Sequence, residues 1–588
     1  MQNALLRRAF EFDTANPSQM SNRISPLAAL IAFSIATVIL AQGITAPFVK
    51  DAEPQAAAWI QDVACRKHIL VPRDYYGELA RKPPLFYWAA GALTAVTGGR
   101  VDEIRARMMS VLAGASIALM VLIWSTTFLD STSGWFAFLF LLGSYAFTSR
   151  GSLALEDMML VAFVFAAWCL LYPTIEGGPS PRTIIAVGVA CGLGILTKGP
   201  IAIVLPAFGV AIYLLLTHRS LVAQLRRRWP WTIFAISLAI ALLWYIPALL
   251  ADRGELARII FQENLGHFLP PGAGGTGEAA RPFYYIAMKL IGGSTPLNFL
   301  LPALAVTLVR GDFTEEAYKP LMFQFSFLIA ILFFFTVASA KRDDYVLPAI
   351  PSLAIFLAAL FTSLREGGMA QRVRDIASIV VAAGALLGIA AAAWWICIGP
   401  GLPAYGINPT SRDQTELFLV YYVHALSPFL LMMAFVVGAS AALIAVGLRR
   451  NYPASTAAGL GALSLLGVLI FTAVLRPQMA RERTLKYAAA DINRIALNAP
   501  IYVINENEEL SFYLGREAPQ ITGARNRARS IEQPVYLFAY RGNFRKLGTL
   551  FCAGCKLTLQ WDRAGGSGLP ALYRLPPERA KPQFALDK

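Results

Sequence analysis

PRTIIAVGVACGLGILTKGPIAIVLPAFGVAIYLLL, residues 181–216, consists of two apolar runs joined by a tight turn at Lys198, Gly199 and Pro200. A helix that crosses a lipid bilayer needs roughly 20 predominantly apolar residues, and each run approaches that length. The stretch therefore predicts two neighbouring membrane helices with a lysine held in the turn between them.

Similar apolar runs recur along the chain, which has 588 residues, of which 56% are hydrophobic and only 15% are charged. Soluble domains are nearer half apolar and about a quarter charged, so most of this chain is suited to lipid. We predict about thirteen membrane-spanning helices. Their expected starts lie near Pro26, Arg105, Ser133, Leu153, Thr183, Pro200, Trp231, Tyr284, Lys319, Asp343, Ile376, Leu417 and Ala454. The first run is too long for a signal segment and is interpreted as an uncleaved span.

Basic residues give the expected orientation of these spans. The net charge is +15, and many of the lysines and arginines lie in short loops between apolar runs, outside any nucleic-acid-binding motif. The most basic short loops are 218–229, 364–374 and 448–453. With alternating spans they share one side with the N-terminus, which carries Arg7, Arg8 and Arg23. The positive-inside rule places that side in the cytoplasm, and no nucleic-acid partner is expected.

The chain divides by composition into two expected domains. Residues 1–476 form the membrane module, with outer loops at 49–104 and 251–283. Residues 477–588 are richer in charge and turns and contain short alternating stretches such as VYLFAY (535–540), which predicts a small periplasmic α/β domain. Its CAGC segment carries Cys552 and Cys555, which we expect to form a disulfide in an oxidising compartment.

The same topology collects unusual polar residues on the outer face. They are Asp51, Glu53, Arg81, Lys82, Glu156, Asp157, Lys198, Glu263, His267, Lys341, Arg342, Asp343 and Asp344. Ionisable residues near the membrane are costly and usually face a cavity, so this set predicts one polar cavity. Carboxylates there could activate a hydroxyl or hold a divalent cation, while lysine and arginine suit a phosphate. The aromatic stretch PPLFYW (83–88) is expected to lie along the membrane surface above it.

Each of these residues also has a plain structural interpretation. Asp51 could be an ordinary loop carboxylate, and Lys198 could simply mark a turn. Glu156 and Asp157 suit the start of a helix, where the helix dipole favours negative charge. His267 is more often a loop histidine than a ligand. Only their common location argues for a functional site.

Several segments together resemble a known family. They are FVKDAEPQAAAW around Asp51, RKPPLFYW (81–88), RARMMSVLAG (105–114), LEDMMLVAF (155–163), GLGILTKGPIAIVLP (192–206), ENLGHFL (263–269) and SAKRDDYVLPAIPSLAI (339–355). On these motifs the chain resembles the bacterial aminoarabinose (lipid A) transferases and their protein O-mannosyltransferase-like relatives of the GT-C class. The resemblance covers roughly the first 360 residues. It implies a mainly α, polytopic GT-C fold.

The resemblance also implies roles for individual residues. The catalytic candidates are Asp51 and Asp157; the donor-phosphate candidates are Lys82, Lys198, Tyr345 and Arg281; the secondary candidates are Glu53, Glu156, His267 and Lys341. Arg81 stands where relatives often have Glu, and His267 stands where they have Arg, so Arg281 could take over that contact. No cofactor is required, although Glu263 and His267 could hold a divalent metal.

The resulting hypothesis is an inverting glycosyltransferase in the bacterial inner membrane, with a periplasmic active site. Its donor is a polyprenyl-phosphate-linked sugar, and its first-ranked acceptor is lipid A, with an aminoarabinose-type sugar. Protein, polysaccharide or another lipid are alternative acceptors. A flippase for a lipid-linked sugar is the rival from another class, and a sensor acting through the C-terminal domain is a third. We expect a monomer among membrane lipids.

Overall fold

The computed structural model describes residues 24–49, 52–252, 254–266, 281–338, 340–365, 367–398, 424–497, 499–503, 506–520, 535–540, 558–562 and 570–575. Contacts within the chain divide it into two units. The membrane unit comprises Met1–Ile44, Arg81–Ala90 and Arg107–Gln478. The tail unit comprises Thr45–Ala80, Gly91–Ala106 and Met479–Lys588. Each unit is described by itself.

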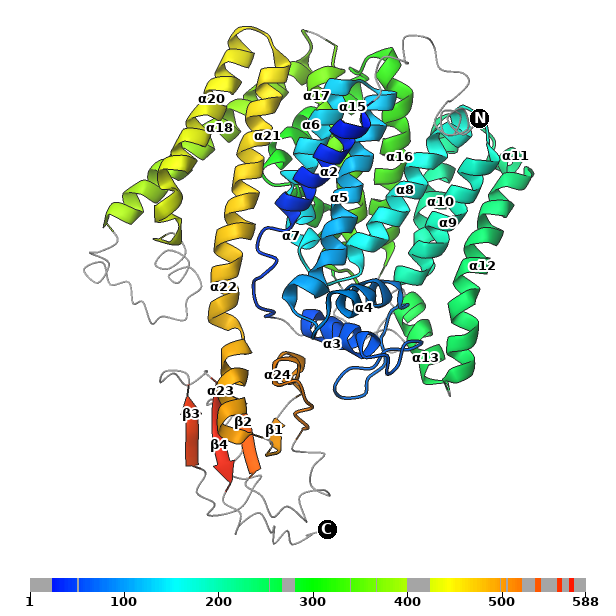
Figure 1. The fold of residues 1–588 in the computed structure, drawn as a ribbon. Coiled ribbons are helices and arrows are strands. Elements are labelled where there is room, and N and C mark those ends of the chain that lie inside the picture. The colour runs from blue at the N-terminus through cyan, green and yellow to red at the C-terminus, as the bar shows by residue number, and fades with distance from the viewer. Residues whose placement is uncertain are drawn as a thin grey trace. The chain divides into compact units, whose positions relative to one another are not determined.

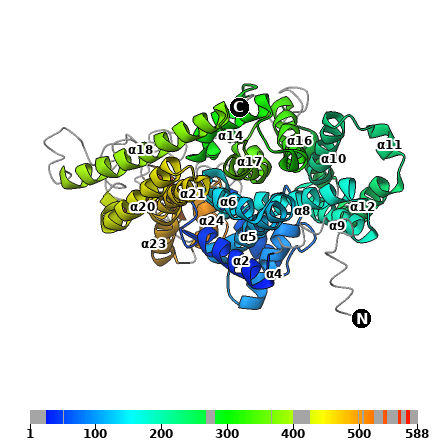
Figure 2. The ribbon, with the colours of Figure 1, turned by 90° about the horizontal axis from the view of Figure 1, so that it is seen from above.

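The membrane unit is built from helices, and its long helices run roughly parallel to one another (Figure 1). In chain order they are α2 (Pro26–Leu40), α5 (Glu103–Phe128), α6 (Ser131–Leu142), α7 (Tyr145–Gly151), α8 (Asp157–Glu176), α9 (Pro181–Lys198), α10 (Ile201–Leu216), α11 (Leu221–Leu225), α12 (Arg228–Ala251), α13 (Glu255–Phe261), η2 (Gln262–Gly266), α14 (Tyr285–Gly293), η3 (Leu297–Leu300), α15 (Leu301–Arg310), α16 (Glu315–Val337), η4 (Asp343–Ala349), α17 (Ile350–Thr362), α18 (Met369–Ile398), η7 (His424–Phe429), α20 (Leu430–Arg449), α21 (Pro453–Leu469), η8 (Ile470–Leu475) and α22 (Arg476–Arg483). Viewed from above, α12 and α18 lie at opposite ends of this bundle (Figure 2).

The expectation of a multi-pass membrane protein is confirmed. In the described part of the chain, nine helices are long and apolar enough to cross a membrane, and a pair bent by 111° (Tyr285–Gly293 and Leu297–Arg310) could add a tenth. Four shorter apolar helices accompany them. The expected starts fall inside or directly beside helices, except Leu153, which lies between α7 and α8, and Leu417, which lies outside the described residues. The count of thirteen stays a prediction.

The hairpin predicted from residues 181–216 is present as α9 and α10. Ser180 and Thr183 form a capping box at the start of α9, and Pro181 occupies its first turn. Gly199 ends the helix with a φ of 99°, which residues with side chains rarely adopt. A Cβ added at this position would lie 2.5 Å from Asn264 Oδ1. Glycine at this position therefore allows the chain to turn directly after Lys198.

The core of the membrane unit fixes the elements that carry its polar residues. Trp168 of α8 stacks on Phe323 and Phe327 of α16, with ring centroids 3.8 and 4.5 Å apart. Helix α17 is buried along nearly its whole length, and it continues directly from η4. Such close packing leaves little freedom for the ends of α8 and α17. The polar residues at these ends are therefore held by a rigid core.

The tail unit combines helices with a small mixed sheet. Its elements include α3 (Ala52–Ala64), α23 (Lys486–Ala496), α24 (Glu508–Leu514), β1 (Ile501–Val503), β2 (Val535–Tyr540), β3 (Thr558–Asp562) and β4 (Pro570–Leu575). The strand order is β1-β2-β4-β3, with β1 parallel to β2 and the other pairs antiparallel. The alternating stretch VYLFAY (535–540) thus forms β2. Cys552 and Cys555 lie outside the described residues, and the α/β domain with its boundary at 477 stays a proposal.

Residues 45–80 overlap the outer loop that we expected at 49–104 of the membrane module, and they belong to the tail unit. The Tyr76 hydroxyl lies 2.9 Å from Ser511 Oγ and accepts a hydrogen bond from the Asn507 amide at 3.0 Å. The Tyr513 hydroxyl accepts from the Phe48 amide at 2.8 Å and donates to Glu103 at 2.9 Å. These bonds join segments more than 400 residues apart in the sequence. The aromatic stretch at 83–88 enters α4 (Leu85–Thr97), where Phe86 and Tyr87 are buried, and its position along the membrane surface stays a prediction.

Glu508 makes the tail unit sensitive to pH. Burial, reinforced by the carboxylates of Asp74 and Glu78, raises the pKa of Glu508 from its ordinary 4.5 to about 8. The folded unit therefore binds this proton more tightly than the unfolded chain does. Its stabilising contribution is complete below about pH 4.5 and is lost as the pH rises through about 8.

We expect hydrogen exchange of the α24 amides, corrected for the intrinsic effect of pH, to show opening that becomes easier between these pH values. Glu508→Gln should flatten the dependence, because an amide does not ionise. Glu517→Gln, at an exposed position in the same unit, is the matched control. An unchanged pH profile in Glu508→Gln would assign the effect to other groups.

Candidate active site

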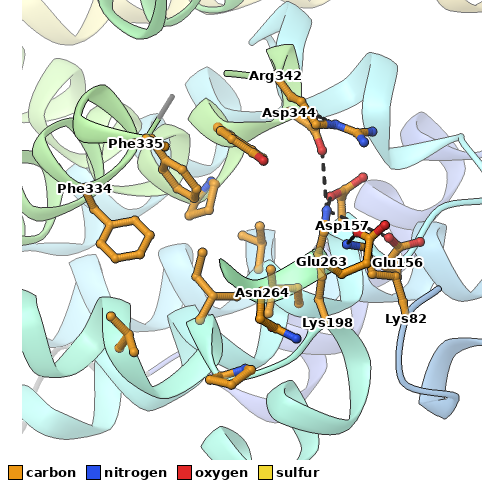
Figure 3. Close-up of a pocket in the computed structure, with 18 of the residues that line it drawn as sticks. Lys82, Glu156, Asp157, Lys198, Glu263, Asn264, Phe334, Phe335, Arg342 and Asp344 are labelled. Carbon is orange, nitrogen blue, oxygen red and sulfur yellow. Dashed lines mark hydrogen bonds and ion pairs between the residues drawn. The ribbon is translucent and has the colours of Figure 1, made fainter. Parts of the chain in front are cut away.

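The membrane unit contains a cavity of about 640 Å³ with one charged and one apolar region (Figure 3). Its charged lining residues are Lys82, Glu156, Asp157, Lys198, Glu263, Arg342 and Asp344. These side chains come from segments far apart in the sequence and point toward a common space. The cavity therefore brings together many of the polar residues that the sequence places on one face.

Lys198 lies at the centre of the charged region. It is the last residue of α9, and its Nζ donates a hydrogen bond to Asp157, the first residue of α8. The same Nζ lies 3.4 Å from Asp344 Oδ2 and 3.9 Å from Glu156 Oε1. All three carboxylates are buried, so they need this positive charge. Lys198 thus joins α8, α9 and η4 in one ion cluster.

Arg342 extends the cluster toward the edge of the cavity. Its Nε donates to Asp344 Oδ1 at 3.2 Å, so this carboxylate lies between a lysine and an arginine. The Asp344 carboxylate also raises the pKa of Arg342, which keeps the guanidinium charged. Guanidinium groups bind phosphate oxygens through two parallel hydrogen bonds. Arg342 is therefore a further candidate for an anionic ligand.

Lys82 and Glu263 form a second ion pair in the lining. Lys82 lies in the loop before α4, and its Nζ donates to Glu263 Oε2. Glu263 lies in the π-helix η2, which follows α13. Short π-helical segments often occur at functional sites. The pair holds Lys82 at the cavity. A ligand phosphate could take the place of Glu263 as the partner of Lys82.

The charges of the lining nearly balance. Among the described lining residues, three are cations (Lys82, Lys198 and Arg342) and four are carboxylates (Glu156, Asp157, Glu263 and Asp344). A phosphate entering this space adds negative charge where a carboxylate already engages each cation. Binding therefore requires an exchange of partners, in which a cation turns from a carboxylate toward the phosphate.

The other region of the cavity is apolar. Phe335 of α16 stacks on Tyr345 of η4 with ring centroids 4.4 Å apart. Ile201 and Val204 of α10 and Tyr245 of α12 also line this region. Apolar walls suit a hydrocarbon chain and exclude water from the charges beside them. The cavity can therefore accept a molecule with an anionic group and an attached lipid chain.

Only some of the predicted site residues line the cavity. Those that line the cavity are Lys82, Glu156, Asp157, Lys198, Glu263 and Tyr345. Arg281 and Lys341 are not in its lining; the Arg281 guanidinium lies 5.4 Å from the Tyr285 ring, and Lys341 Nζ donates to the Ala338 carbonyl at 2.6 Å. Glu53 is buried in α3 of the tail unit. Asp51 and His267 lie outside the described residues.

Some lining residues had no individual role assigned from the sequence. Arg342 and Asp344 belong to the noted charged run at 341–344, but a run alone does not tell which members face a cavity. Asn264 lies in the motif ENLGHFL but was given no role, and Tyr245 looks like an ordinary residue of an apolar helix. The short 3₁₀ helix η4 determines which of residues 343–345 face the cavity.

A divalent metal was considered from the sequence at Glu263 and His267. Within the described ranges, no group of three or more His, Cys, Asp or Glu residues is arranged to hold a metal ion. Glu263 is engaged by Lys82, and His267 is not described. The described donor set does not fit a metal site, so no chemical step is derived through a metal.

Comparison with known proteins gives matches of sequence and of fold. Residues 81–246 match the family described as dolichyl-phosphate-mannose-protein mannosyltransferase. An undecaprenyl phosphate-alpha-4-amino-4-deoxy-L-arabinose arabinosyl transferase from Pseudomonas savastanoi pv. phaseolicola is 27% identical over 368 residues, which cover 61% of this chain and 65% of that relative. A protein of the same name from Shewanella sediminis is 26% identical over 282 residues, covering 47% of this chain and 49% of the relative. The matches thus span about half to two thirds of these relatives.

The fold comparison covers more of the chain. The crystal structure of ArnT from Cupriavidus metallidurans bound to undecaprenyl phosphate superposes with a TM-score of 0.71 at 17% identity. It covers 95% of this chain and 100% of that one. The apo structure of the same protein gives a TM-score of 0.69. The chain therefore has the fold of this ArnT, and part of its sequence is similar to the named arabinosyl transferases and to the mannosyltransferase family.

Proposed function

We propose that this protein transfers a sugar from a polyprenyl-phosphate carrier to an acceptor at the outer face of a bacterial inner membrane. The observation that carries the proposal is the cavity that joins a charged region to an apolar one. A polyprenyl-phosphate sugar has the same two parts, a phosphate and a long hydrocarbon chain. The relatives named above are arabinosyl transferases of such a carrier, which supports the same donor class here.

The charged residues suit the leaving group of this reaction. As the acceptor oxygen bonds to the anomeric carbon with inversion, the bond from that carbon to the phosphate oxygen breaks. The carrier phosphate then gains negative charge, which Lys82, Lys198 and Arg342 are positioned to stabilise. Preorganised charges of this kind usually make the largest contribution to catalysis. Asp157 and Asp344 hold the cations in place in the meantime.

Asp51 is the proposed base. Its carboxylate would take the proton of the acceptor hydroxyl as that oxygen attacks, so that the products are the glycosylated acceptor and the free polyprenyl phosphate. We rank lipid A first as the acceptor. We rank an aminoarabinose-type sugar first as the group transferred, because the names of the relatives above include that sugar. The basic loops expected on the opposite side support a periplasmic position for the cavity.

The test is mass spectrometry of lipid A from a bacterial host that lacks its own transferase of this class but supplies the lipid-linked sugar. We expect expression of this protein to add an increment with the mass of one sugar to lipid A. An unmodified lipid A, with equal expression and donor present, would contradict lipid A as the acceptor. If the donor is consumed and the sugar is found on protein, polysaccharide or another lipid, the transferase proposal holds with a different acceptor. If the donor is not consumed but has crossed the membrane, the result favours a flippase.

Asp51→Asn separates the chemical step from binding. An amide has the size of the carboxylate but cannot accept the proton of the acceptor. Loss of a general base lowers rates by about 10²- to 10⁴-fold, and we expect at least about 100-fold in turnover with little change in donor affinity. The measurement is initial rate against donor concentration in proteoliposomes. Turnover equal to that of the wild type would show that Asp51 is not the base.

A further inference from the structure

The membrane unit has a second cavity, of about 620 Å³, at the start of α12. It is lined by Arg226, Arg227, Arg228, Trp231, Thr232, Ala235, Ile236 and Ala239, and we call it the arginine groove. Both ribbon views place α11 and α12 at the edge of the membrane unit (Figures 1 and 2). The arginine groove is therefore open to the surroundings of the helix bundle.

The arginine groove and the candidate active site lie toward opposite membrane faces. The groove is at the N-terminal end of α12, whereas η2 with Glu263 follows the C-terminal end of this helix after α13. Since α12 has 24 residues, these ends are separated by about 36 Å along a helix that rises about 1.5 Å per residue. A molecule bound in the arginine groove would therefore be separate from one bound in the candidate active site.

One end of the arginine groove is strongly cationic. Arg226, Arg227 and Arg228 are consecutive and exposed. None of the ion pairs found among the described residues involves them, in contrast to Arg219 nearby, whose Nη1 lies 2.6 Å from Glu176 Oε1. The first turn of α12 has no acidic residue, and no side chain caps it. Uncompensated guanidinium groups beside the positive end of a helix dipole favour a phosphate.

The other end of the arginine groove is apolar and faces lipid. Ala235 and Ala239 are exposed and one helical turn apart, so their small side chains leave a furrow along α12. Trp231 is 59% exposed, and its Nε1 donates to the Leu225 carbonyl at 2.8 Å, which ties α11 to α12. Exposed tryptophan is typical of the boundary between headgroups and hydrocarbon. The groove thus changes from charged to apolar at the level of that boundary.

We propose that the arginine groove binds one anionic phospholipid, with its phosphate at Arg226, Arg227 and Arg228 and an acyl chain along Ala235 and Ala239. Charge complementarity selects the headgroup, and the lipid-facing furrow selects a ligand that carries a hydrocarbon chain. Basic pockets beside membrane helices bind anionic headgroups in this way. A loop that only directs membrane orientation needs positive charge, but it needs neither a furrow nor an aromatic anchor.

The test uses the full-length protein, purified in detergent and depleted of lipid. Native mass spectrometry measures binding of dioleoyl phosphatidylglycerol, with zwitterionic dioleoyl phosphatidylcholine as the comparison. We expect one phosphatidylglycerol to bind clearly more tightly than phosphatidylcholine. Each basic residue near an anionic headgroup contributes roughly a fivefold factor, so Arg226→Gln with Arg227→Gln should weaken binding of phosphatidylglycerol by roughly 25-fold.

Two further variants make the result specific. Arg449→Gln with Arg450→Gln removes the same number of exposed charges at the end of α20 and should leave binding unchanged. Ala239→Trp fills the furrow without altering charge and should also weaken binding. Equal affinity for both lipids, equal loss in the Arg449 and Arg450 control, or full binding in Ala239→Trp would overturn the proposal. Displacement of the lipid by soluble glycerol phosphate would also overturn it, because the site would then be one for free phosphate.

Discussion

Lys198→Met should abolish sugar transfer and destabilise the membrane unit together. The substitution keeps a long unbranched side chain but removes the positive charge that Asp157, Asp344 and Glu156 share. Removing one partner of a buried ion pair destabilises proteins by about 3–5 kcal/mol, because the remaining charge is uncompensated. Loss of a preorganised charge beside the leaving group lowers turnover by roughly 10³-fold. Thermal unfolding in detergent and initial rates in proteoliposomes measure the two effects.

Two companion variants show which part of the effect belongs to the site. Lys319→Met removes an exposed lysine of α16 and should change neither quantity. Lys198→Arg keeps the charge, so it should restore most of the stability, although the larger guanidinium should not restore full turnover. If Lys198→Met folds and turns over like wild type, the lysine only marks the turn before Gly199.

Lys82→Met is expected to lower turnover by roughly 10²- to 10³-fold with a smaller effect on stability. Lys82 has one described carboxylate partner, Glu263, whereas Lys198 has three. Its proposed role is to leave Glu263 and neutralise the charge that develops on the carrier phosphate. The expected signature is a fall in turnover measured over a range of donor concentrations, with a smaller rise in KM.

Glu263→Gln tests the exchange of partners directly. The amide holds Lys82 more weakly than the carboxylate does, so the lysine becomes more available to the phosphate. We therefore expect the KM for the donor to stay the same or fall. The double variant, with Lys82→Met added, should behave like Lys82→Met alone. If Glu263→Gln lost as much activity as Lys82→Met, the carboxylate would have a role of its own, such as binding a metal or the acceptor.

The sequence was most informative where local chemistry determines the structure. The apolar runs located the helices, and the hairpin around Lys198 follows from the cap at Ser180 and the turn at Gly199. The pairing of Asp157 with Lys198 is consistent with the shared face that alternating spans assign to them. Such features depend on hydropathy and helix signals, which a single sequence displays.

Other features depend on contacts that a single sequence does not display. In the run 341–344, the packing of η4 turns Asp344 toward Lys198, whereas Asp343 pairs with Lys289 at 2.9 Å. Residues 45–80 join the tail unit through partners such as Ser511, which no local pattern connects to Tyr76. The 111° bend between Gly293 and Leu297 also interrupts a run that looks like one continuous span.

The bond between Asp157 and Lys198 has a consequence for the biogenesis of the protein. The two residues lie at the start of α8 and the end of α9, which are successive helices of the chain and pack against each other. During synthesis, the translocon can therefore release these helices as one hairpin with both charges already neutralised. Asp344 is made almost 150 residues later and enters an ion pair that already exists. Early pairing would neutralise two buried charges of the candidate active site before the rest of the bundle is complete.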